Sequence, residues 1–299
     1  MKTICHSPRN QRFRTVFLIL IILLATGVLK AQSTFSAEVT GAGIPIILIP
    51  GLGCDGSVWK ETVTRLQESG YACHVITLAG FAGTPAPDTT SIALIVSDLN
   101  RYIGALGRKP ILIGHSLGGI IGLRLAIDHP SGLEKLVIVD ALPFLPAAMN
   151  PAATVEMIRP QAAMMKTFTL NQPVNQFKAS TQNSLRMMIA DSASRSLAVE
   201  WAVRSNRRIF ASMTDELMTT DLRQAVSGIR CPVLVLGAWA AAKPYGLTME
   251  TVKKTYESQY ARLKGVTVEM APNAYHFIML DEPVWMMDRI LPFLGGKRS

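Results

Sequence analysis

The sequence predicts an α/β fold: a mostly parallel sheet of roughly eight strands, with helices on both faces and an inserted helical cap. From residue 35 onward, short and almost wholly apolar runs alternate with stretches of helical periodicity. This is the pattern of a parallel sheet covered on both sides. Residues 110–119 pass from an apolar run through a glycine-rich turn into a helix. Residues 143–227 interrupt the alternation, because they contain no strand-like run.

The N-terminal 31 residues have the features of an export signal. They hold five basic residues and no acidic one, with an uninterrupted apolar run at 16–24 and small residues up to Ser33. This order describes a secretory signal peptide, and the apolar stretch is shorter than the ~20 residues of a membrane-spanning helix. We therefore expect residues 1–31 to be removed and the protein to be secreted or periplasmic. An uncleaved N-terminal membrane anchor is the alternative.

The charge of the remaining chain is unremarkable. The whole chain has a formal net charge of +9, from 30 basic and 21 acidic residues. Without the five basic residues of the signal, 25 basic residues face 21 acidic ones, which leaves +4. No basic run or aromatic-interleaved patch follows the signal, so we expect no nucleic-acid binding. The remaining length suffices for one large α/β domain with an insertion.

The core begins with three strands and a helix. Residues 44–49 are apolar almost throughout, which predicts a central strand. Residues 35–40 predict an edge strand before it, and residues 73–78 predict the next strand. A helix with one apolar face lies between the last two strands and ends at Gly70.

A second helix leads to the centre of the sheet. Its apolar residues recur at steps of three and four until Gly107, which is the spacing of one helix face. Residues 110–114 then predict a buried strand and residues 120–127 a helix. Residues 136–140 predict a further buried strand that ends in an acid, Asp140. The apolar face of the second helix consists of Ile92, Ile95, Leu99, Ile103 and Leu106.

Residues 143–227 predict the helical cap, inserted between two parts of the core at 35–142 and 228–296. Eight of the chain's 14 methionines fall in this stretch. Because methionine adapts to irregular spaces, these side chains either fill the cap's own small core or line an apolar substrate cleft. After the cap, the core resumes with a strand over 232–236.

The C-terminal elements follow the same alternation. A loop and a helix with one apolar face, over residues 249–263, come after the resumed strand. Residues 266–270 predict the last strand, and a closing helix starts at Pro283.

The turn at residues 114–118 carries the clearest chemical signal. It reads Gly-His-Ser-Leu-Gly and fits the G-x-S-x-G nucleophile elbow, in which the serine lies on a strained strand-to-helix turn. Glycines at both ends avoid collisions with the neighbouring strand and helix. The N–H of Leu117 lies at the helix N-terminus, where an oxyanion would form. Ser116 is the candidate nucleophile, and Leu117 a candidate oxyanion donor.

With this motif, nearly all of the chain after residue 34 resembles the α/β-hydrolase superfamily, in its serine-nucleophile branch with a helical cap. Residues 44–53 resemble the strand and oxyanion loop that precede the elbow, and residues 75–84 resemble the next strand and its glycine turn. The resemblance implies that Leu52 supplies the second N–H of the oxyanion hole. It also implies that His276, late in the chain, is the catalytic base.

The residues themselves support this base but leave the acid open. Of the five histidines, only His276 follows a strand at the catalytic edge, and imidazole suits the proton transfer that a serine nucleophile needs. Relatives usually carry the acid after the strand at 233–236, where this chain has no carboxylate before Glu250. Asp140 is our candidate because it directly ends a central strand. A structural role for Asp140 is the alternative, and Asp281 and Glu250 are lesser candidates that helix termini also explain.

Together these residues predict a hydrolase that cleaves carboxylic esters through an acyl-enzyme, with Ser116, His276 and Asp140 as the triad. The serine excludes the dehalogenase and epoxide-hydrolase branches, which use aspartate. Thioesterase, lactonase, amidase and carbon–carbon hydrolase chemistry remain open on the same triad, as does a degenerate binding protein of this fold. We expect a small, apolar ester as substrate, no cofactor or metal, and no stable membrane anchor after signal cleavage.

Overall fold

The computed structural model describes residues 33–295. The expected signal peptide, residues 1–31, lies outside the described residues, as does residue 296 at the end of the expected core. No helix between residues 33 and 295 is long and apolar enough to cross a membrane.

A sheet of seven strands runs through the described residues in the order β1-β3-β2-β4-β5-β6-β7. β1 pairs antiparallel with β3, and the other pairings are parallel. The predicted mostly parallel architecture is confirmed, although this part of the chain has seven strands instead of roughly eight. The strands are β1 (Phe35–Thr40), β2 (Ile44–Ile49), β3 (Tyr71–Leu78), β4 (Ile111–His115), β5 (Lys135–Val139), β6 (Val233–Gly237) and β7 (Thr267–Met270).

β2 shows why the apolar runs become buried strands. All six of its residues are buried. Ile47 and Ile49 belong to one hydrophobic core, whereas Ile46 and Leu48 belong to another. Successive side chains of a strand point to opposite faces of the sheet. A strand with a core on each face is therefore apolar at every position.

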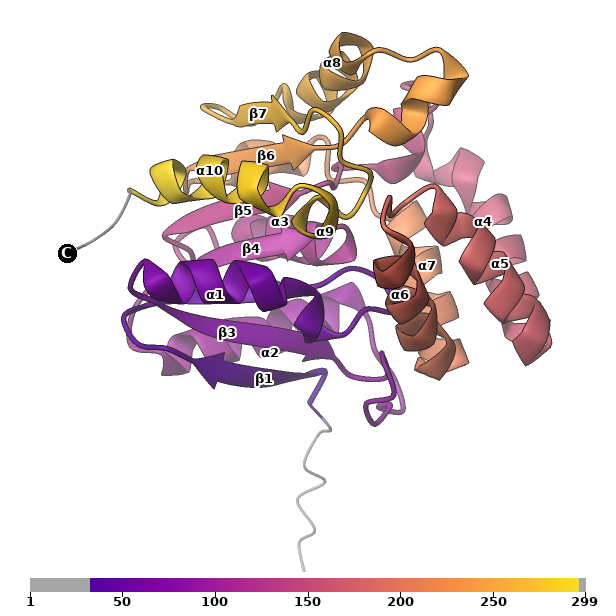
Figure 1. The fold of residues 1–299 in the computed structure, drawn as a ribbon, viewed down its shortest axis with the longest axis horizontal. Coiled ribbons are helices and arrows are strands. Elements are labelled where there is room, and N and C mark those ends of the chain that lie inside the picture. The colour runs from indigo at the N-terminus through magenta and orange to yellow at the C-terminus, as the bar shows by residue number, and fades with distance from the viewer. Residues whose placement is uncertain (1–32, 296–299) are drawn as a thin grey trace, which may run out of the picture. The chain divides into compact units, whose positions relative to one another are not determined.

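Helices cover both faces of the sheet (Figure 1). Residues of α1 (Lys60–Glu68), α9 (Ile278–Asp281) and α10 (Pro283–Leu294) belong to the core on one face. Residues of α2 (Ile92–Ala105), α3 (Leu117–Asp128) and α8 (Met249–Tyr260) belong to the core on the other. The described part also contains four short 3₁₀ helices: Gly56–Trp59, Leu145–Ala148, Ala225–Gly228 and Ala240–Tyr245.

Three elements begin earlier than the sequence predicts, and β5 does so by one residue, at Lys135. β3 begins at Tyr71 instead of residue 73, because Tyr71 pairs with Ile44 at the start of β2. α3 begins at Leu117, directly after Ser116, instead of at residue 120. The two glycines after Leu117 weaken the helical signal in the sequence, but tertiary contacts hold them in the helix.

Four α-helices lie between β5 and β6 in the described chain, where the sequence predicts the cap. α4 (Val155–Asn171) packs against α7 (Arg207–Thr219), and α5 (Val174–Arg186) packs against α6 (Ser192–Arg204). In Figure 1 these helices lie beside the arrowheads of the parallel strands, which mark their carboxyl ends. The cap therefore lies at the edge of the sheet that carries the predicted site residues.

The cap methionines do not form a core. Of the eight, only Met213 is buried, and Met218 is half-buried. The interpretation that they fill the cap's interior is therefore wrong for most of them, because the helices pair through other side chains. The exposed ones are Met149 (89%), Met157 (59%), Met164 (67%), Met165 (38%), Met187 (41%) and Met188 (38%).

Candidate active site

Ser116 occupies a strained turn between β4 and α3. Its φ is +53° and its ψ is −116°, a conformation that residues with a side chain rarely adopt. The Ser116 N–H donates to the Val139 carbonyl at 3.0 Å, which ties the turn to the end of β5. The predicted elbow serine therefore lies at the carboxyl edge of the central strands.

The glycine at position 118 permits this turn by its lack of a side chain. A Cβ on Gly118 would lie 2.2 Å from the carbonyl oxygen of Ile49, the last residue of β2. A Cβ on Gly114 would lie 2.3 Å from the Gly118 carbonyl oxygen. Helix α3 lies too close to β2 for a side chain at Gly118 and too close to β4 for one at Gly114, so the motif requires glycine at both ends.

Two of the backbone N–H groups near Ser116 that have no acceptor within residues 33–295 are candidates for an oxyanion hole. They belong to Leu117, the first residue of α3, and to Leu52, in the loop after β2. That loop passes beside the nucleophile, since a Cβ on Gly51 would lie 3.3 Å from Ser116 Cβ. Free N–H groups at a helix N-terminus and a neighbouring loop can stabilise a developing negative charge.

His276 lies in the loop between β7 and α9, and its ring is bound to Asp140. The Nδ1–H of His276 donates to Asp140 Oδ2 at 2.5 Å. Within the described chain, the Ser116 hydroxyl and His276 Nε2 form no hydrogen bond to each other. Such hydrogen bonds often tighten only when substrate binds.

Two carboxylates hold the loop that carries His276. Asp281 Oδ2 accepts the Tyr275 N–H at 2.8 Å. Glu282 Oε2 accepts the N–H groups of Asn273 and Ala274, each at 2.9 Å. The backbone on the N-terminal side of His276 is therefore fixed by the hydrogen bonds that it donates to two carboxylates at the junction of α9 and α10.

Asp140 lies at the end of β5, with a φ of +50°. Its carboxylate is 10% exposed and accepts three hydrogen bonds. Oδ2 binds His276, and Oδ1 accepts the Ala238 N–H and the Tyr256 hydroxyl, each at 2.6 Å. The structure thus brings Asp140 to His276, although it lies in sequence before the position that relatives usually use.

The two lesser candidates for the acid have other partners. Glu250 is exposed on α8 and pairs with Lys254 at 3.5 Å. Asp281 accepts two backbone N–H groups, those of Tyr275 and Ala190. Burial raises the pKa of Asp281. Neither carboxylate contacts the imidazole of His276 in the described residues.

His115, the residue before the nucleophile, supports the loop of His276. It is completely buried, and its Nε2 lies 3.1 Å from the His276 carbonyl oxygen. Because a carbonyl only accepts, Nε2 carries the proton. Its ring centroid lies 4.6 Å from those of both His276 and Phe277. Burial, and then the charge of His276, lowers the pKa of His115 well below its usual value, so it stays neutral.

The cap contacts both loops of the site. The Met188 carbonyl, between α5 and α6, accepts the Phe277 N–H at 3.2 Å, next to His276. On the other side, a Cβ on Gly53 would lie 2.7 Å from the ring of Phe210 in α7. The Ser205 hydroxyl accepts the Ala82 N–H at 3.0 Å. The cap is thus packed against the oxyanion loop and hydrogen-bonded to the histidine loop.

The sequence does not predict two contacts of this site. These are the hydrogen bond from Tyr256 to Asp140 and the contact of His115 with the loop of His276. The sequence pattern gives only a helix with one apolar face over residues 249–263, which includes Tyr256. A buried tyrosine hydroxyl needs a partner, which was the available signal, but the helix pattern does not say which partner. The contact of His115 with His276 joins residues 161 positions apart, and no local pattern predicts it.

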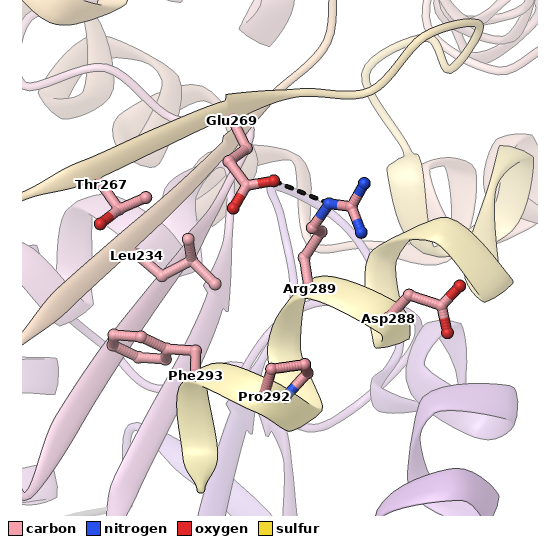
Figure 2. Close-up of a pocket in the computed structure, with 7 residues that line it drawn as sticks. All are labelled: Leu234, Thr267, Glu269, Asp288, Arg289, Pro292 and Phe293. Carbon is pink, nitrogen blue, oxygen red and sulfur yellow. Dashed lines mark ion pairs between the residues drawn. The ribbon is translucent and has the colours of Figure 1, made fainter. Parts of the chain in front are cut away.

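A surface pocket lies elsewhere, between the edge of the sheet and α10 (Figure 2). It has a volume of about 400 Å³, and an ion pair of 2.7 Å joins Glu269 to Arg289 across it. None of the candidate site residues lines it. Within residues 33–295 no group of three or more histidine, cysteine or acidic side chains could hold a metal ion. The pocket is lined by Leu234, Thr267, Glu269, Asp288, Arg289, Pro292 and Phe293.

Known proteins share both sequence and fold with this chain. It is 28% identical over 215 residues to the pimeloyl-(acyl-carrier protein) methyl ester esterase of Vibrio atlanticus (strain LGP32), which covers 69% of this chain and 79% of that protein. A hydrolase from Pseudomonas aeruginosa PA01 has a similar structure, with a TM-score of 0.72, 20% identity, and 89% and 97% of the two chains covered. The enol-lactonase from Burkholderia xenovorans LB400 has a TM-score of 0.70 and 18% identity over 87% and 96%.

The sequence model described as the alpha/beta hydrolase family matches residues 46–289. This match includes the elbow of Ser116, the end of β5 and the loop of His276. It also spans the four helices of the cap. The protein is therefore a member of the alpha/beta hydrolase family.

Proposed function

We propose that this protein is an exported serine hydrolase that cleaves carboxylic esters with Ser116, His276 and Asp140. The observation that carries the proposal is the 2.5 Å hydrogen bond from His276 Nδ1 to Asp140 Oδ2, formed at the edge where the elbow presents Ser116. Three residues from three separate loops supply a nucleophile, a base and an acid there.

The mechanism follows from these groups. Ser116 Oγ attacks the ester carbonyl carbon while His276 Nε2 takes its proton, and the Leu52 and Leu117 N–H groups bind the oxyanion. His276 then gives the proton to the leaving alkoxide as the carbon–oxygen bond breaks. A water molecule attacks the acyl-enzyme with its proton passing to His276. Collapse of this second intermediate releases the carboxylic acid and returns the proton to Ser116.

Backbone strain at the nucleophile argues against the degenerate binding protein. A non-glycine residue at positive φ costs about 1–3 kcal/mol, and both Ser116 and Asp140 pay it. The N–H groups of Leu52 and Leu117, which have no acceptor within residues 33–295, also argue against a degenerate binding protein. A binding protein gains nothing from these costs, whereas an acyl-transfer site uses each of them.

Esters are favoured among the possible acyl compounds by the activities for which one similar protein and one similar structure are named. The Vibrio protein, 28% identical, is named as a methyl ester esterase. The enol-lactonase, similar in fold, acts on a cyclic ester according to its name. Thioesters, amides and carbon–carbon bonds next to a carbonyl remain alternatives on the same triad.

An apolar acyl group suits the cap. Met187 and Met188 are exposed on the link between α5 and α6, and this link is hydrogen-bonded to the residue after His276. Methionine side chains are flexible and apolar and accommodate varied shapes. The link is therefore a suitable wall for a hydrocarbon chain.

The decisive experiment combines an ester panel with covalent labelling. p-Nitrophenyl esters of increasing acyl length should be hydrolysed, and a fluorophosphonate should label the protein once, on the peptide that contains Ser116. Ser116→Ala should lose the label and several powers of ten in turnover. Labelling that persists in this variant would sink the assignment. Activity on matched amides or thioesters, without activity on esters, would mean that the substrate is an amide or a thioester and not an ester.

Export is tested separately. Expressed with its full N-terminus in a Gram-negative host, the protein should appear in the periplasm or medium with an N-terminus near residue 32. N-terminal sequencing of the purified protein checks this. An intact N-terminus in the membrane fraction would contradict the cleaved signal and favour the anchor.

A further inference from the structure

Asp140 depends on α8 for its second oxygen. While Oδ2 faces His276, Oδ1 accepts two hydrogen bonds of 2.6 Å, from the Tyr256 hydroxyl and the Ala238 N–H. A carboxylate held at one oxygen only can rotate about its Cβ–Cγ bond, whereas one held at both cannot. The orientation of Oδ2 toward His276 Nδ1 is thus set by the partners of Oδ1.

The Ala238 donor lies in the loop after β6, where relatives usually carry the acid. In this chain that loop contributes a backbone N–H to an acid that comes from β5. Because Asp140 sits at a positive φ of +50°, its backbone alone does not favour the required geometry. Its side chain therefore needs support from neighbouring elements, and the loop and α8 supply it.

Tyr256 is suited to be a permanent donor. It is buried, at 6% exposed. Burial, then the charge of Asp140 and the hydrogen bond to it, raises the pKa of Tyr256 well above its usual value. The hydroxyl therefore keeps its proton over the whole range in which an esterase works. It donates to Asp140 at every such pH.

Space for the Tyr256 ring is reserved by the last residue of β6. A Cβ on Gly237 would lie 3.0 Å from Tyr256 Cζ, and 2.8 and 2.9 Å from the Sδ and Cε atoms of Met270. The φ of Gly237 is not positive, so the backbone conformation at this position does not require glycine. The absence of a side chain there is what lets the ring reach Asp140.

We propose that Tyr256 is a positioning residue of the catalytic triad, which holds Asp140 Oδ1 so that Oδ2 stays aligned with His276 Nδ1. This inference rests on the proposed function. By donating to the carboxylate, the Tyr256 hydroxyl also takes up part of the negative charge that Asp140 presents to His276.

The chain offers a matched control in Tyr260, one turn further along α8. It is as deeply buried as Tyr256, and burial likewise raises its pKa well above the usual value. Its hydroxyl donates to the Ala141 carbonyl at 2.8 Å instead of to the carboxylate. The titratable groups around Asp140 are His276 from the loop after β7, the two tyrosines from α8, and His115, whose ring centroid lies 4.6 Å from that of His276.

The test compares Tyr256→Phe with Tyr260→Phe in the full protein, by ester kinetics between pH 5 and 10. Tyr256→Phe should lower kcat about tenfold with KM changed less than twofold. This loss is smaller than the ~10⁴ expected from removal of the acid itself. The acidic limb of its kcat/KM profile should move up by about 0.5 pH unit, because the carboxylate presents more charge to the imidazole. Tyr260→Phe should change kcat and the limb little.

A second readout does not need turnover. The proton between His276 Nδ1 and Asp140 Oδ2 should give a far-downfield ¹H NMR resonance, which His276→Gln removes. Tyr256→Phe should shift or broaden this resonance, and Tyr260→Phe should leave it in place. Gly237→Ala, which displaces the ring, should reproduce the Tyr256→Phe shift.

The proposal is overturned if Tyr256→Phe leaves kcat, the acidic limb and the resonance unchanged. It is also overturned if Tyr260→Phe produces the same changes, because the effect would then come from packing of α8. A failure of the proposed function looks different: Ser116→Ala or Asp140→Asn would keep full activity. The resonance would still report whether Tyr256 orients Asp140.

Discussion

Asp140 and His276 are hydrogen-bonded at 2.5 Å across 136 positions of sequence, with the acid at the end of β5 and the histidine after β7. Strands β5, β6 and β7 are consecutive neighbours in the sheet. The carboxylate therefore reaches past the end of β6, whose following residue, Ala238, donates to it. The proposed acid therefore comes from the end of β5 and lies at the Nδ1 of His276.

The role of Asp140 is tested by three amide substitutions. Asp140→Asn should keep the fold and the fluorophosphonate site but lose about 10⁴ in turnover at neutral pH, because an amide cannot fix the imidazole tautomer or stabilise its cation. Glu250→Gln and Asp281→Asn should each change the rate less than tenfold, which is under ~1.4 kcal/mol in the barrier. Steady-state kinetics on a short ester measures all three. If Asp140→Asn has nearly wild-type turnover and one of the other two variants loses most of its turnover, the acid is the residue replaced in that other variant.

The elbow glycine should be intolerant of any side chain. In Gly118→Ala the new Cβ meets the Ile49 carbonyl oxygen at 2.2 Å, and a backbone atom of a central strand cannot move aside. We expect a loss of about 2–3 kcal/mol in the free energy of unfolding, measured by urea denaturation. Gly104→Ala is the control: nothing lies within 4 Å of its Cβ in helix α2, and it should stabilise by about 0.5–1 kcal/mol. Equal effects for the two variants would mean that the elbow relaxes freely.

Oxidation of the cap methionines should impair long substrates selectively. Peroxide converts exposed methionine to a polar sulfoxide, whereas the Cys73 and Cys231 thiols are protected because burial raises their pKa to about 11. Hydrolysis of long-chain esters should fall more than hydrolysis of acetate esters. A variant with Met187→Leu and Met188→Leu should keep its long-chain activity after peroxide. Equal losses of activity on short and long esters would mean that these methionines do not line the substrate cleft.

Alkaline pH should destabilise the protein through its buried tyrosines. Burial, above all, raises the pKa of Tyr256 and Tyr260 well above the usual value, whereas in the unfolded chain both lose their proton near pH 10. Above that pH the unfolded state binds fewer protons than the folded state, so stability falls as pH rises. Each tyrosine contributes a slope of about 1.4 kcal/mol per pH unit. Denaturant unfolding between pH 8 and 11 should show a shallower decline for Tyr260→Phe than for the wild type, and an unchanged slope would contradict the shifted titration.

The fold could be predicted in large part because burial on both faces leaves a strong trace in the sequence. β2 is apolar at every position, and the turn around Ser116 combines a glycine motif with a strand and a helix. Asp140 could be selected as a candidate because it ends such a strand. Each of these signals is local, so the sequence alone carries it.

The parts that were missed depend on contacts between distant elements. The tyrosine at position 256 occupies an apolar helix face, and the same pattern arises whether its hydroxyl meets a carboxylate or a carbonyl. The cap methionines are apolar by type, but which face of α4 meets α7 is decided by the packing of the pair. β3 begins two residues earlier than predicted because Tyr71 pairs with Ile44 of β2. The residues next to Tyr71 in the sequence do not specify this pairing.

The left-handed backbone at Ser116 and Asp140 matters for anyone who evolves this protein in the laboratory. At φ values of +53° and +50°, glycine would relieve strain at both positions. A selection for heat resistance alone would therefore reward replacement of the proposed nucleophile, whereas Asp140 is retained by the three hydrogen bonds that its carboxylate accepts. A library screened without a substrate would drift toward stable, inert descendants. Only a screen that measures product retains Ser116.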